Sequence, residues 1–303
     1  MSYPFSALVG QIPLKLALIL NAINPALGGL LIQGQHGTAK STAARSLANL
    51  LPAINVAELD VELRTNNQLE YVFLPRLPHT PFVELPLNVT ADRLLGQLTP
   101  RRDDLPLFEM GLLGQAHQGV LYVDDINLLP RPMLNLLLDA TASGLNHVER
   151  AGVSASHSAQ FILLGTMNPT EGALPSQIVD RFGLMVNLRG ETDLTHRAEL
   201  VQRRIAYEQD PIQFCDQFIE AEQMLQQRIT EARNLMPMVT VSESMVQQMS
   251  QLCLDNHVEG LRADISLYKT AQTLAAWLGR EQVLPDDIEQ AAEFVLPHRR
   301  CCQ

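Results

Sequence analysis

The stretch GQHGTAKST, residues 34–42, lies between two runs with different hydrophobic patterns. Residues 30–33 before it form a short, mostly apolar run typical of a buried strand, and residues 40–51 after it have helical spacing that stops at Pro52. A strand, a glycine-bearing loop and a helix, in that order, form the context of a Walker A loop. Backbone N–H groups and the helix N-terminus bind phosphate in such loops. The stretch therefore predicts a nucleotide-binding α/β domain.

The loop positions have distinct expected roles in nucleotide binding. Lys40 is expected to reach the β- and γ-phosphates, and the hydroxyl of Ser41 is expected to bind Mg²⁺. The residue before the lysine is commonly glycine in this motif, and here it is Ala39. The predicted nucleotide-binding residues are Gly34, Gln35, His36, Gly37, Thr38, Ala39, Lys40, Ser41 and Thr42. A chance glycine-rich turn is the alternative for this loop taken alone.

A second motif follows the apolar run GVLYV, residues 119–123, which predicts a buried parallel strand. Asp124 stands at its carboxyl end and is expected to hold Mg²⁺ as a Walker B carboxylate. The next position normally carries the glutamate that polarises the attacking water, and here it is Asp125. Its side chain is shorter by about 1.5 Å, and a misplacement of about 1 Å can lower a rate about 100-fold. The sequence therefore supports ATP binding better than rapid hydrolysis.

Three other polar residues are candidates for catalysis. Asn168 follows a predicted strand at residues 161–166, where it would orient water beside the γ-phosphate or would only form an Asn-Pro turn. Arg181 ends a short predicted helix, as an ion-pair partner or as an arginine finger acting on a neighbouring subunit's nucleotide. Arg262 begins a predicted helix, from which it would reach the phosphates or pair with Asp264 on the surface.

The predicted elements divide the chain into two domains. Strands alternate with helices up to residue 190, which is typical of a doubly wound α/β domain. In this domain we expect helices at residues 14–23, 40–51 and 91–98, strands at 30–33, 82–85, 119–123 and 161–166, and a proline-rich loop at 75–81. In a second, all-helical domain at residues 191–303 we expect helices at 195–207, 215–235, 242–256, 263–278 and 285–294.

The composition is that of an ordinary globular protein, with 46% hydrophobic and 18% charged residues. A formal net charge of −11 disfavours nucleic-acid binding. No segment approaches the roughly 20 apolar residues that span a bilayer, and the first residues lack a signal-peptide pattern, so a cytoplasmic location is expected. The scattered histidines argue against a structural zinc site. The cysteines lack CxxC spacing and are expected to be free thiols: Cys215, Cys253, Cys301 and Cys302.

Several stretches together resemble the AAA+ subunit of magnesium chelatase. They are VGQ at residues 9–11, GQHGTAKST at 34–42, FEMGLLGQAHQGVLYVDDINLL at 108–129, VERAG at 148–152, GTMNPTEGALPSQIVDRFGL at 165–184, GLRADI at 260–265 and VLPHRR at 295–300. That family also has an alanine before the Walker A lysine, which matches Ala39. It has glutamate in the place of Asp125, and this departure puts the rate of hydrolysis in question.

The resemblance implies an AAA+ fold: a five-stranded αβα domain with a helical lid and two insertions. One insertion is expected at residues 82–107 within the second helix, and the other is a hairpin at residues 147–157 before the strand that leads to Asn168. ATP and Mg²⁺ are the implied cofactors. By the motif match, Arg181 becomes the arginine finger and Arg262 the sensor 2 residue.

The resemblance also implies partners. Such a subunit forms ATP-dependent homo-oligomeric rings, usually hexameric, that stack with a related AAA+ subunit of von Willebrand type. Together they drive a large porphyrin-binding subunit that inserts Mg²⁺ into protoporphyrin IX. Related subunits serve cobalt insertion into a corrin precursor, so the metal is left open. Membrane insertion is not expected.

Two other functions share this fold and nucleotide site. A MoxR-type AAA+ chaperone would remodel a protein partner, but VERAG and DRFGL favour the chelatase. A nucleic-acid motor related to replicative helicases is disfavoured by the acidic charge. Salt-sensitive DNA binding or DNA-stimulated hydrolysis would distinguish that motor from the chelatase subunit.

Overall fold

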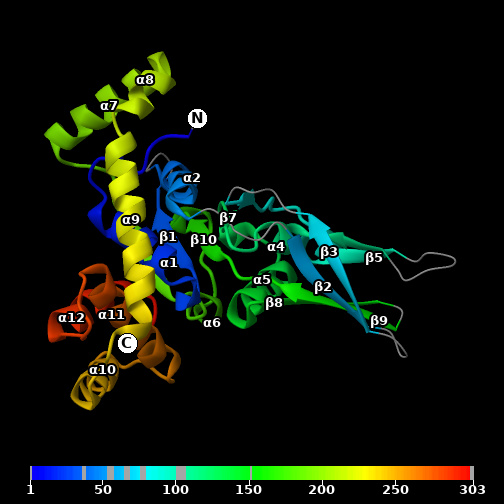
Figure 1. Cartoon of the computed structure of the whole chain (residues 1–303). Coiled ribbons are helices and arrows are strands. Elements are labelled where there is room, and N and C mark those ends of the chain that lie inside the picture. Colours follow the sequence, from blue (N-terminus) through cyan, green and yellow to red (C-terminus); the bar gives the residue numbers. More distant parts are fainter. Residues whose placement is uncertain are drawn as a thin grey trace. The chain divides into compact units, whose positions relative to one another are not determined.

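The computed structural model describes residues 2–35, 39–52, 58–64, 69–75, 80–99, 107–150 and 152–300 (Figure 1). By their contacts these residues form two compact units. Unit 1 combines residues 1–52 with residues 166–303, and unit 2 consists of residues 53–165. Unit 1 therefore contains both the predicted phosphate-binding loop and the helical region, while unit 2 contains the predicted Walker B carboxylates.

Parallel strands form the centre of unit 1. β1, Leu30–Gly34, pairs in parallel with β11, Leu184–Leu188, so that Leu30 lies opposite Leu184. α1, Ile12–Ile23, and α2, Lys40–Leu50, pack against each other, and α1 also contacts both strands. The residues of β1 are buried except for the half-buried Gln33, as the apolar run predicts.

Unit 2 contains three more parallel strands. β4, Phe82–Glu84, pairs with β7, Val120–Val123, and β7 pairs in turn with β10, Ile162–Met167. Each residue of β7 is buried. α5, Arg131–Ser143, buries Leu134, Leu137 and Leu138. With β1 and β11 these make the five parallel strands that the resemblance implies.

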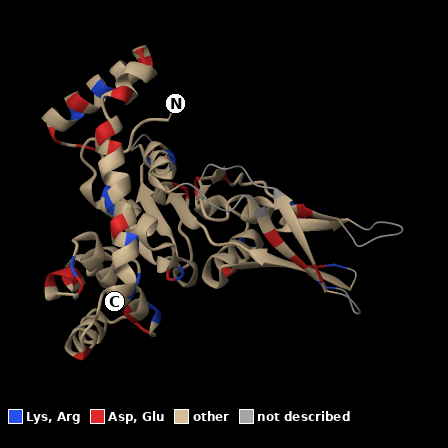
Figure 2. Cartoon of the chain, in the orientation of Figure 1, with Lys and Arg blue, Asp and Glu red and all other residues tan. Residues whose placement is uncertain are grey.

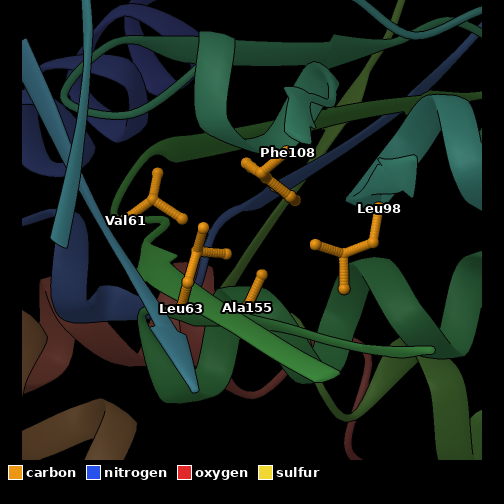
Figure 3. Close-up of a cluster of buried hydrophobic side chains, with 5 residues drawn as sticks. All are labelled: Val61, Leu63, Leu98, Phe108 and Ala155. Atoms are coloured by element: carbon orange, nitrogen blue, oxygen red, sulfur yellow. The ribbon is translucent and has the colours of Figure 1, made fainter. Parts of the chain in front are cut away.

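Unit 2 also contains a four-stranded antiparallel sheet in the order β3-β2-β9-β8. Its strands are β2 at Glu58–Arg64, β3 at Leu69–Pro75, β8 at Leu145–Arg150 and β9 at Val153–Ser158. Strands β8 and β9 form the hairpin that the resemblance implies at residues 147–157. Side chains from this sheet pack with two from the paired strands β5, Gly96–Thr99, and β6, Leu107–Met110, as Figure 3 shows. The cluster consists of Val61, Leu63, Leu98, Phe108 and Ala155.

The insertion expected at residues 82–107 begins later than predicted, because Phe82–Glu84 is strand β4 of the parallel sheet. The short helices α3, Ala91–Leu95, and α4, Leu112–Gln115, flank a hairpin of β5, Gly96–Thr99, and β6, Leu107–Met110. The helix predicted at residues 91–98 is therefore wrong beyond Leu95. Gly96 has φ +100°, and a Cβ there would lie 2.6 Å from the carbonyl oxygen of Glu109, so only glycine fits this turn from helix to strand.

Helices form the rest of unit 1. They are α6 at Ser176–Val179, α7 at Leu194–Gln209, α8 at Pro211–Asp216, α9 at Ile219–Leu235, α10 at Glu243–Asp255, α11 at Arg262–Trp277 and α12 at Pro285–Val295. α11 packs against α9, α10, α12 and α1. Figure 2 shows Lys and Arg interspersed with Asp and Glu along α7 and α9.

Other parts of the structure differ from the expectations or add to them. The helix predicted at residues 215–235 is interrupted after Asp216, where the ring of Phe218 packs 5.1 Å from that of Phe214. The strand expected at residues 82–85 is β4, in which Phe82 and Val83 are half-buried and Glu84 is exposed. Phe82 stacks on Tyr122 at 5.7 Å. Strands β2 and β3 were not predicted. Of the predicted proline-rich loop, residues 76–79 lie outside the described residues.

No helix in the described ranges is long and apolar enough to cross a membrane. Of the four cysteines, the structure describes two, and both are free: Cys215 is half-buried and Cys253 is buried. Burial raises the pKa of the Cys253 thiol to about 11, which keeps it protonated at neutral pH. The predicted domain boundary at residues 190–191 stays a prediction.

Candidate nucleotide site

The predicted phosphate-binding loop connects β1 to α2 in unit 1. Gly34 ends β1, and Lys40 is the first residue of α2. The side-chain amine of Lys40 donates hydrogen bonds to the carbonyl oxygens of Gly34, at 2.5 Å, and Gln35, at 3.1 Å. Lys40 is 8% exposed, so its charge is fixed in position at the N-terminal end of the helix. A fixed cation beside a helix N-terminus is suited to bind phosphate.

Ala39, immediately before this lysine, adopts a left-handed backbone conformation with φ 57° and ψ 23°. This conformation costs a residue with a Cβ about 1–2 kcal/mol, which explains why glycine is common at this position. Ser41, the predicted Mg²⁺ ligand, is exposed, and Thr42 is half-buried. The other predicted loop residues, His36, Gly37 and Thr38, lie outside the described residues.

In unit 2, Asp124 and Asp125 follow the last residue of β7, as the sequence predicts. Asp124 is exposed, and its Oδ1 accepts a 2.8 Å hydrogen bond from the hydroxyl of the fully buried Tyr122. Asp125 is half-buried and left-handed, with φ 48°, a conformation that aspartate tolerates better than most residues. The strand thus orients Asp124 through a buried neighbour two residues earlier.

The chemistry of Ser41 and Asp124 fits Mg²⁺, which prefers oxygen ligands. In nucleotide sites this ion takes only one or two protein oxygens and completes its shell with phosphates and water. Among the described residues no three His, Cys, Asp or Glu side chains are grouped to hold a metal. The assignment of Ser41 and Asp124 as Mg²⁺ ligands stays a prediction.

Asn168 follows β10 and is 4% exposed. Its Oδ1 accepts from the backbone N–H of Thr170, at 3.3 Å, and its Nδ2 donates to Oε1 of Glu171, at 3.2 Å. These contacts cap the short helix Pro169–Glu171. Asn168 therefore forms the Asn-Pro turn that was the alternative role for this residue. A role of Asn168 at the γ-phosphate stays a prediction.

The two candidate arginines of unit 1 are connected through Asp180. Arg262 donates from Nη1 to Oδ2 of Asp180 at 2.6 Å, so its ion-pair partner is Asp180 and not Asp264, which the alternative role for this residue named. The half-buried Arg181 is the next residue after Asp180. Both arginines therefore belong to one local arrangement, although they are 81 positions apart in the sequence.

The other oxygen of Asp180 is bound by Arg299, whose side chain is 1% exposed. Nε of Arg299 donates to Oδ1 of Asp180 at 3.0 Å. The neighbouring His298 hydrogen-bonds through Nε2 to the carbonyl oxygen of Phe182, at 3.1 Å. Burial, followed by the charge of Arg299, lowers the pKa of His298 to about 3, so this histidine is neutral at physiological pH.

Sequence reasoning missed Tyr122, Asp180 and Arg299. The spacing of Tyr122 and Asp124 could have identified the first, because residues i and i+2 of a strand point to the same side. For Asp180 and Arg299 no short-range signal exists, since 119 positions separate them.

Three features define an AAA+ P-loop ATPase. They are a glycine-bearing loop that fixes a lysine at a helix N-terminus, a buried parallel strand that ends in carboxylates, and a C-terminal group of helices. Residues 5–182 match the family model described as "Magnesium chelatase, subunit ChlI", and residues 246–303 match the AAA lid domain. The chain belongs to the magnesium chelatase ChlI family, and it is an ATPase of the magnesium chelatase type.

Relatives cover nearly the whole chain. The chain is 41% identical to the magnesium-chelatase subunit ChlI homolog of Methanocaldococcus jannaschii, over 98% of this chain and 85% of that protein. It is 39% identical to magnesium-chelatase subunit ChlI of Synechocystis, over 98% and 88%. An uncharacterized protein of Mycobacterium tuberculosis is 45% identical over 98% of this chain, which spans only 45% of that protein.

Solved structures are also similar. A chain from the complex of the magnesium chelatase subunits BchI and BchD aligns with 36% identity and a TM-score of 0.54, over 100% of this chain and 97% of that chain. An ATPase described as putative, from Cytophaga hutchinsonii, has a TM-score of 0.64 at 20% identity and covers 97% of this chain. The second likeness supports the fold alone.

Proposed function

We propose that this chain is the ATP-binding and ATP-hydrolysing motor subunit that drives insertion of Mg²⁺ into a tetrapyrrole by a separate large subunit. The observation that carries the proposal is the Lys40 amine, held by Gly34 and Gln35 at the start of α2, in a chain of the ChlI family. The tetrapyrrole itself is expected to bind to the large subunit.

The proposed nucleotide chemistry gives each predicted site residue a role. The loop from Gly34 to Thr42 binds the phosphates, with Lys40 at the β- and γ-phosphates. Ser41 and Asp124 hold Mg²⁺, which neutralises charge on the phosphates when it is bound. Asp125 activates the attacking water, and because it is shorter than glutamate we expect slow turnover.

The proposed subunit works as a homo-oligomeric ring, with a hexamer as the expected form. In a ring each subunit presents one surface to its neighbour's different surface. Arg181 then acts on the nucleotide of the neighbouring subunit, and Arg262 contacts the nucleotide of its own subunit from the lid at residues 191–303. Such an arginine supplies about 10³- to 10⁵-fold in rate.

The partners proposed are a related AAA+ subunit of von Willebrand type and a large chelatase subunit. Support comes from the solved complex of BchI with BchD, which aligns along this whole chain. A role in cobalt insertion remains the alternative for the metal, and it requires a large subunit that binds a corrin precursor. The matches to ChlI along the chain favour the chelatase over a MoxR-type chaperone.

The test is a reconstitution. The chain is combined with candidate von Willebrand-type and large subunits, ATP, and either protoporphyrin IX with Mg²⁺ or a corrin precursor with Co²⁺. We expect ATP-dependent formation of the magnesium porphyrin. Its absorbance and fluorescence measure this product. Metal insertion that is independent of this chain or of ATP contradicts the proposal, and insertion of Co²⁺ alone reassigns the metal.

A further inference from the structure

The side chain of Arg299, just after α12, makes five hydrogen bonds with described residues. Besides the bond to Oδ1 of Asp180, its Nη2 donates to the carbonyl oxygens of Asp180, at 3.0 Å, and Phe182, at 2.5 Å. Its Nη1 donates to the carbonyl oxygens of Gly183, at 3.1 Å, and Val295, at 2.7 Å. Four of the five bonds therefore hold one short segment, residues 180–183.

Residues 27–29 also contact this segment, where the backbone N–H of Gly183 donates to the carbonyl oxygen of Gly28 at 3.4 Å. The backbone N–H of Leu184 donates to the carbonyl oxygen of Gly29 at 3.1 Å. A Cβ on Gly183 would lie 1.7 Å from the carbonyl oxygen of Leu27, so the two backbones are in direct contact there. Phe182 is fully buried. Both residues 27–29 and the guanidinium of Arg299 therefore hold the segment.

Arg181 lies within this segment, between two residues whose carbonyl oxygens Arg299 binds. A guanidinium is suited to this contact because its five N–H donors lie in one rigid plane, whereas a lysine has three donors on a single nitrogen. The buried charge is balanced by the carboxylate of Asp180, which also binds Arg262. Arg299 therefore fixes the backbone from which Arg181 projects.

We infer that Arg299 is a positioning residue for ATP hydrolysis, one that holds Arg181 in place to act on the nucleotide of the neighbouring subunit. The inference rests on the proposed function, because it requires Arg181 to act across a subunit interface. Arg299 does not contact nucleotide in this account. Because a shift of about 1 Å in a reacting group can lower a rate about 100-fold, loosening residues 180–183 is expected to slow hydrolysis strongly.

The first test compares ATP turnover by the assembled ring of full-length protein. Arg299→Ala is expected to lower kcat at least about tenfold with little change in KM or in nucleotide affinity, because the binding loop is untouched. Arg299→Lys keeps the charge but not the planar set of donors, and its kcat is expected to lie nearer to that of Arg299→Ala than to that of the parent.

Arg280→Ala is the matched control. Arg280 is another lid arginine that binds a buried carboxylate, since its Nη1 and Nη2 donate to Asp287 at 2.9 and 2.5 Å. No hydrogen bond of Arg280 reaches residues 180–183 among the described contacts. Arg280→Ala should lower the unfolding temperature and leave kcat near that of the parent.

Mixed rings separate a role across the interface from a general loss of stability. Arg299→Ala subunits keep Lys40, Asp124 and Asp125 but have a displaced Arg181. Asp125→Asn subunits have the reverse, an impaired site and a well-placed Arg181. When the two variants are co-assembled in equal amounts, about a quarter of the interfaces combine an intact Asp125 with a well-placed Arg181 of the neighbouring subunit. The mixed rings should therefore regain turnover up to about a quarter of the parent rate. Arg181→Ala mixed with Asp125→Asn is the reference.

Each outcome decides between the two claims. Recovery in both mixtures supports the inference. Recovery with Arg181→Ala but not with Arg299→Ala overturns the inference and leaves the proposed interface role intact. No recovery in either mixture overturns the proposed interface role of Arg181 itself. A parent-like kcat in Arg299→Ala also overturns the inference, because Arg299 would then have no role in turnover. Unfolding of both Arg299 variants overturns it as well, because the role of Arg299 would then be in stability alone.

Discussion

The buried hydroxyl of Tyr122 donates a 2.8 Å hydrogen bond to Oδ1 of the exposed Asp124. The two residues are two positions apart at the end of β7, so their side chains point to the same side. The tyrosine ring is in turn held by stacking on Phe82. A rigid donor thus fixes the orientation of the carboxylate that we propose as an Mg²⁺ ligand.

Tyr122→Phe removes this donor without removing the ring. We expect the Mg²⁺ concentration for half-maximal ATP hydrolysis to rise about three- to tenfold, the equivalent of one hydrogen bond. An Mg²⁺ titration at saturating ATP measures it. Tyr71→Phe is the control, because Tyr71 is 57% exposed on β3 and should have no effect. An unchanged Mg²⁺ requirement in Tyr122→Phe would show that the hydrogen bond does not orient a metal ligand.

Ala39→Gly should stabilise the protein, although glycine usually destabilises. The left-handed backbone of Ala39 lowers the free energy of unfolding by about 1–2 kcal/mol. Glycine would remove this strain but would itself lower the free energy of unfolding by about 0.5–1 kcal/mol, because it gives the unfolded chain more entropy. The expected net gain is about 0.5 kcal/mol in the free energy of unfolding, measured by urea denaturation. Ala48→Gly, in the interior of α2, should instead lose about 1 kcal/mol. Equal losses in both variants would contradict the strain at Ala39.

Asp125→Glu should raise ATP turnover, because the longer carboxylate reaches the attacking water better. Nucleotide affinity should stay the same, since binding depends on the loop of Lys40. Steady-state hydrolysis and a nucleotide titration measure the two quantities separately. If the glutamate variant is no faster than the parent, Asp125 is adequate as it stands or is not the catalytic carboxylate.

His298 should make the protein less stable in acid. Its pKa is about 3 in the folded protein, below its ordinary value of 6.5, so between these values the unfolded chain binds a proton that the folded chain does not. The contribution of the neutral His298 to the free energy of unfolding is complete above pH 6.5 and is lost as the pH falls toward 3. At pH 5 the loss is about 1–2 kcal/mol.

His298→Gln keeps a donor for the carbonyl of Phe182 but does not titrate. Relative to the parent, its free energy of unfolding should fall less between pH 7.5 and pH 5, as followed by denaturation at each pH. Burial also lowers the pKa of His157, but that residue is present in both proteins and its effect cancels. Parallel pH curves for the two proteins would mean that His298 is not held neutral in the folded state.

The local patterns predicted the parts of the fold that depend on neighbouring residues. The apolar runs that end at Gly34 and before Asp124 are strands, and the run after Ala39 is a helix. The helix predicted at residues 91–98 was wrong beyond Leu95 because the close approach of Gly96 to Glu109 is a tertiary contact. Strands β2 and β3 went unpredicted, since their pattern of burial becomes clear only once β9 is paired with β2.

In the candidate site, too, the sequence predicted features that depend on neighbouring residues and missed those that depend on tertiary contacts. The sequence motifs identified Lys40, Asp124 and Arg262 as candidates for binding or catalysis. The actual partner of Arg262 is Asp180 and not the nearby Asp264, because the fold brings α11 to the end of α6. The contacts of Arg299 likewise depend on chain segments more than 100 positions apart.

The central claim is that the loop fixed by Lys40 binds ATP. Its most direct test is a titration of the parent and of Lys40→Ala with a fluorescent ATP analogue, after circular dichroism shows that both are folded. We expect binding by the parent and no measurable binding by Lys40→Ala, because the amine held at Gly34 and Gln35 is the loop's only lysine or arginine. Equal affinity in the two proteins would contradict the assignment of the site.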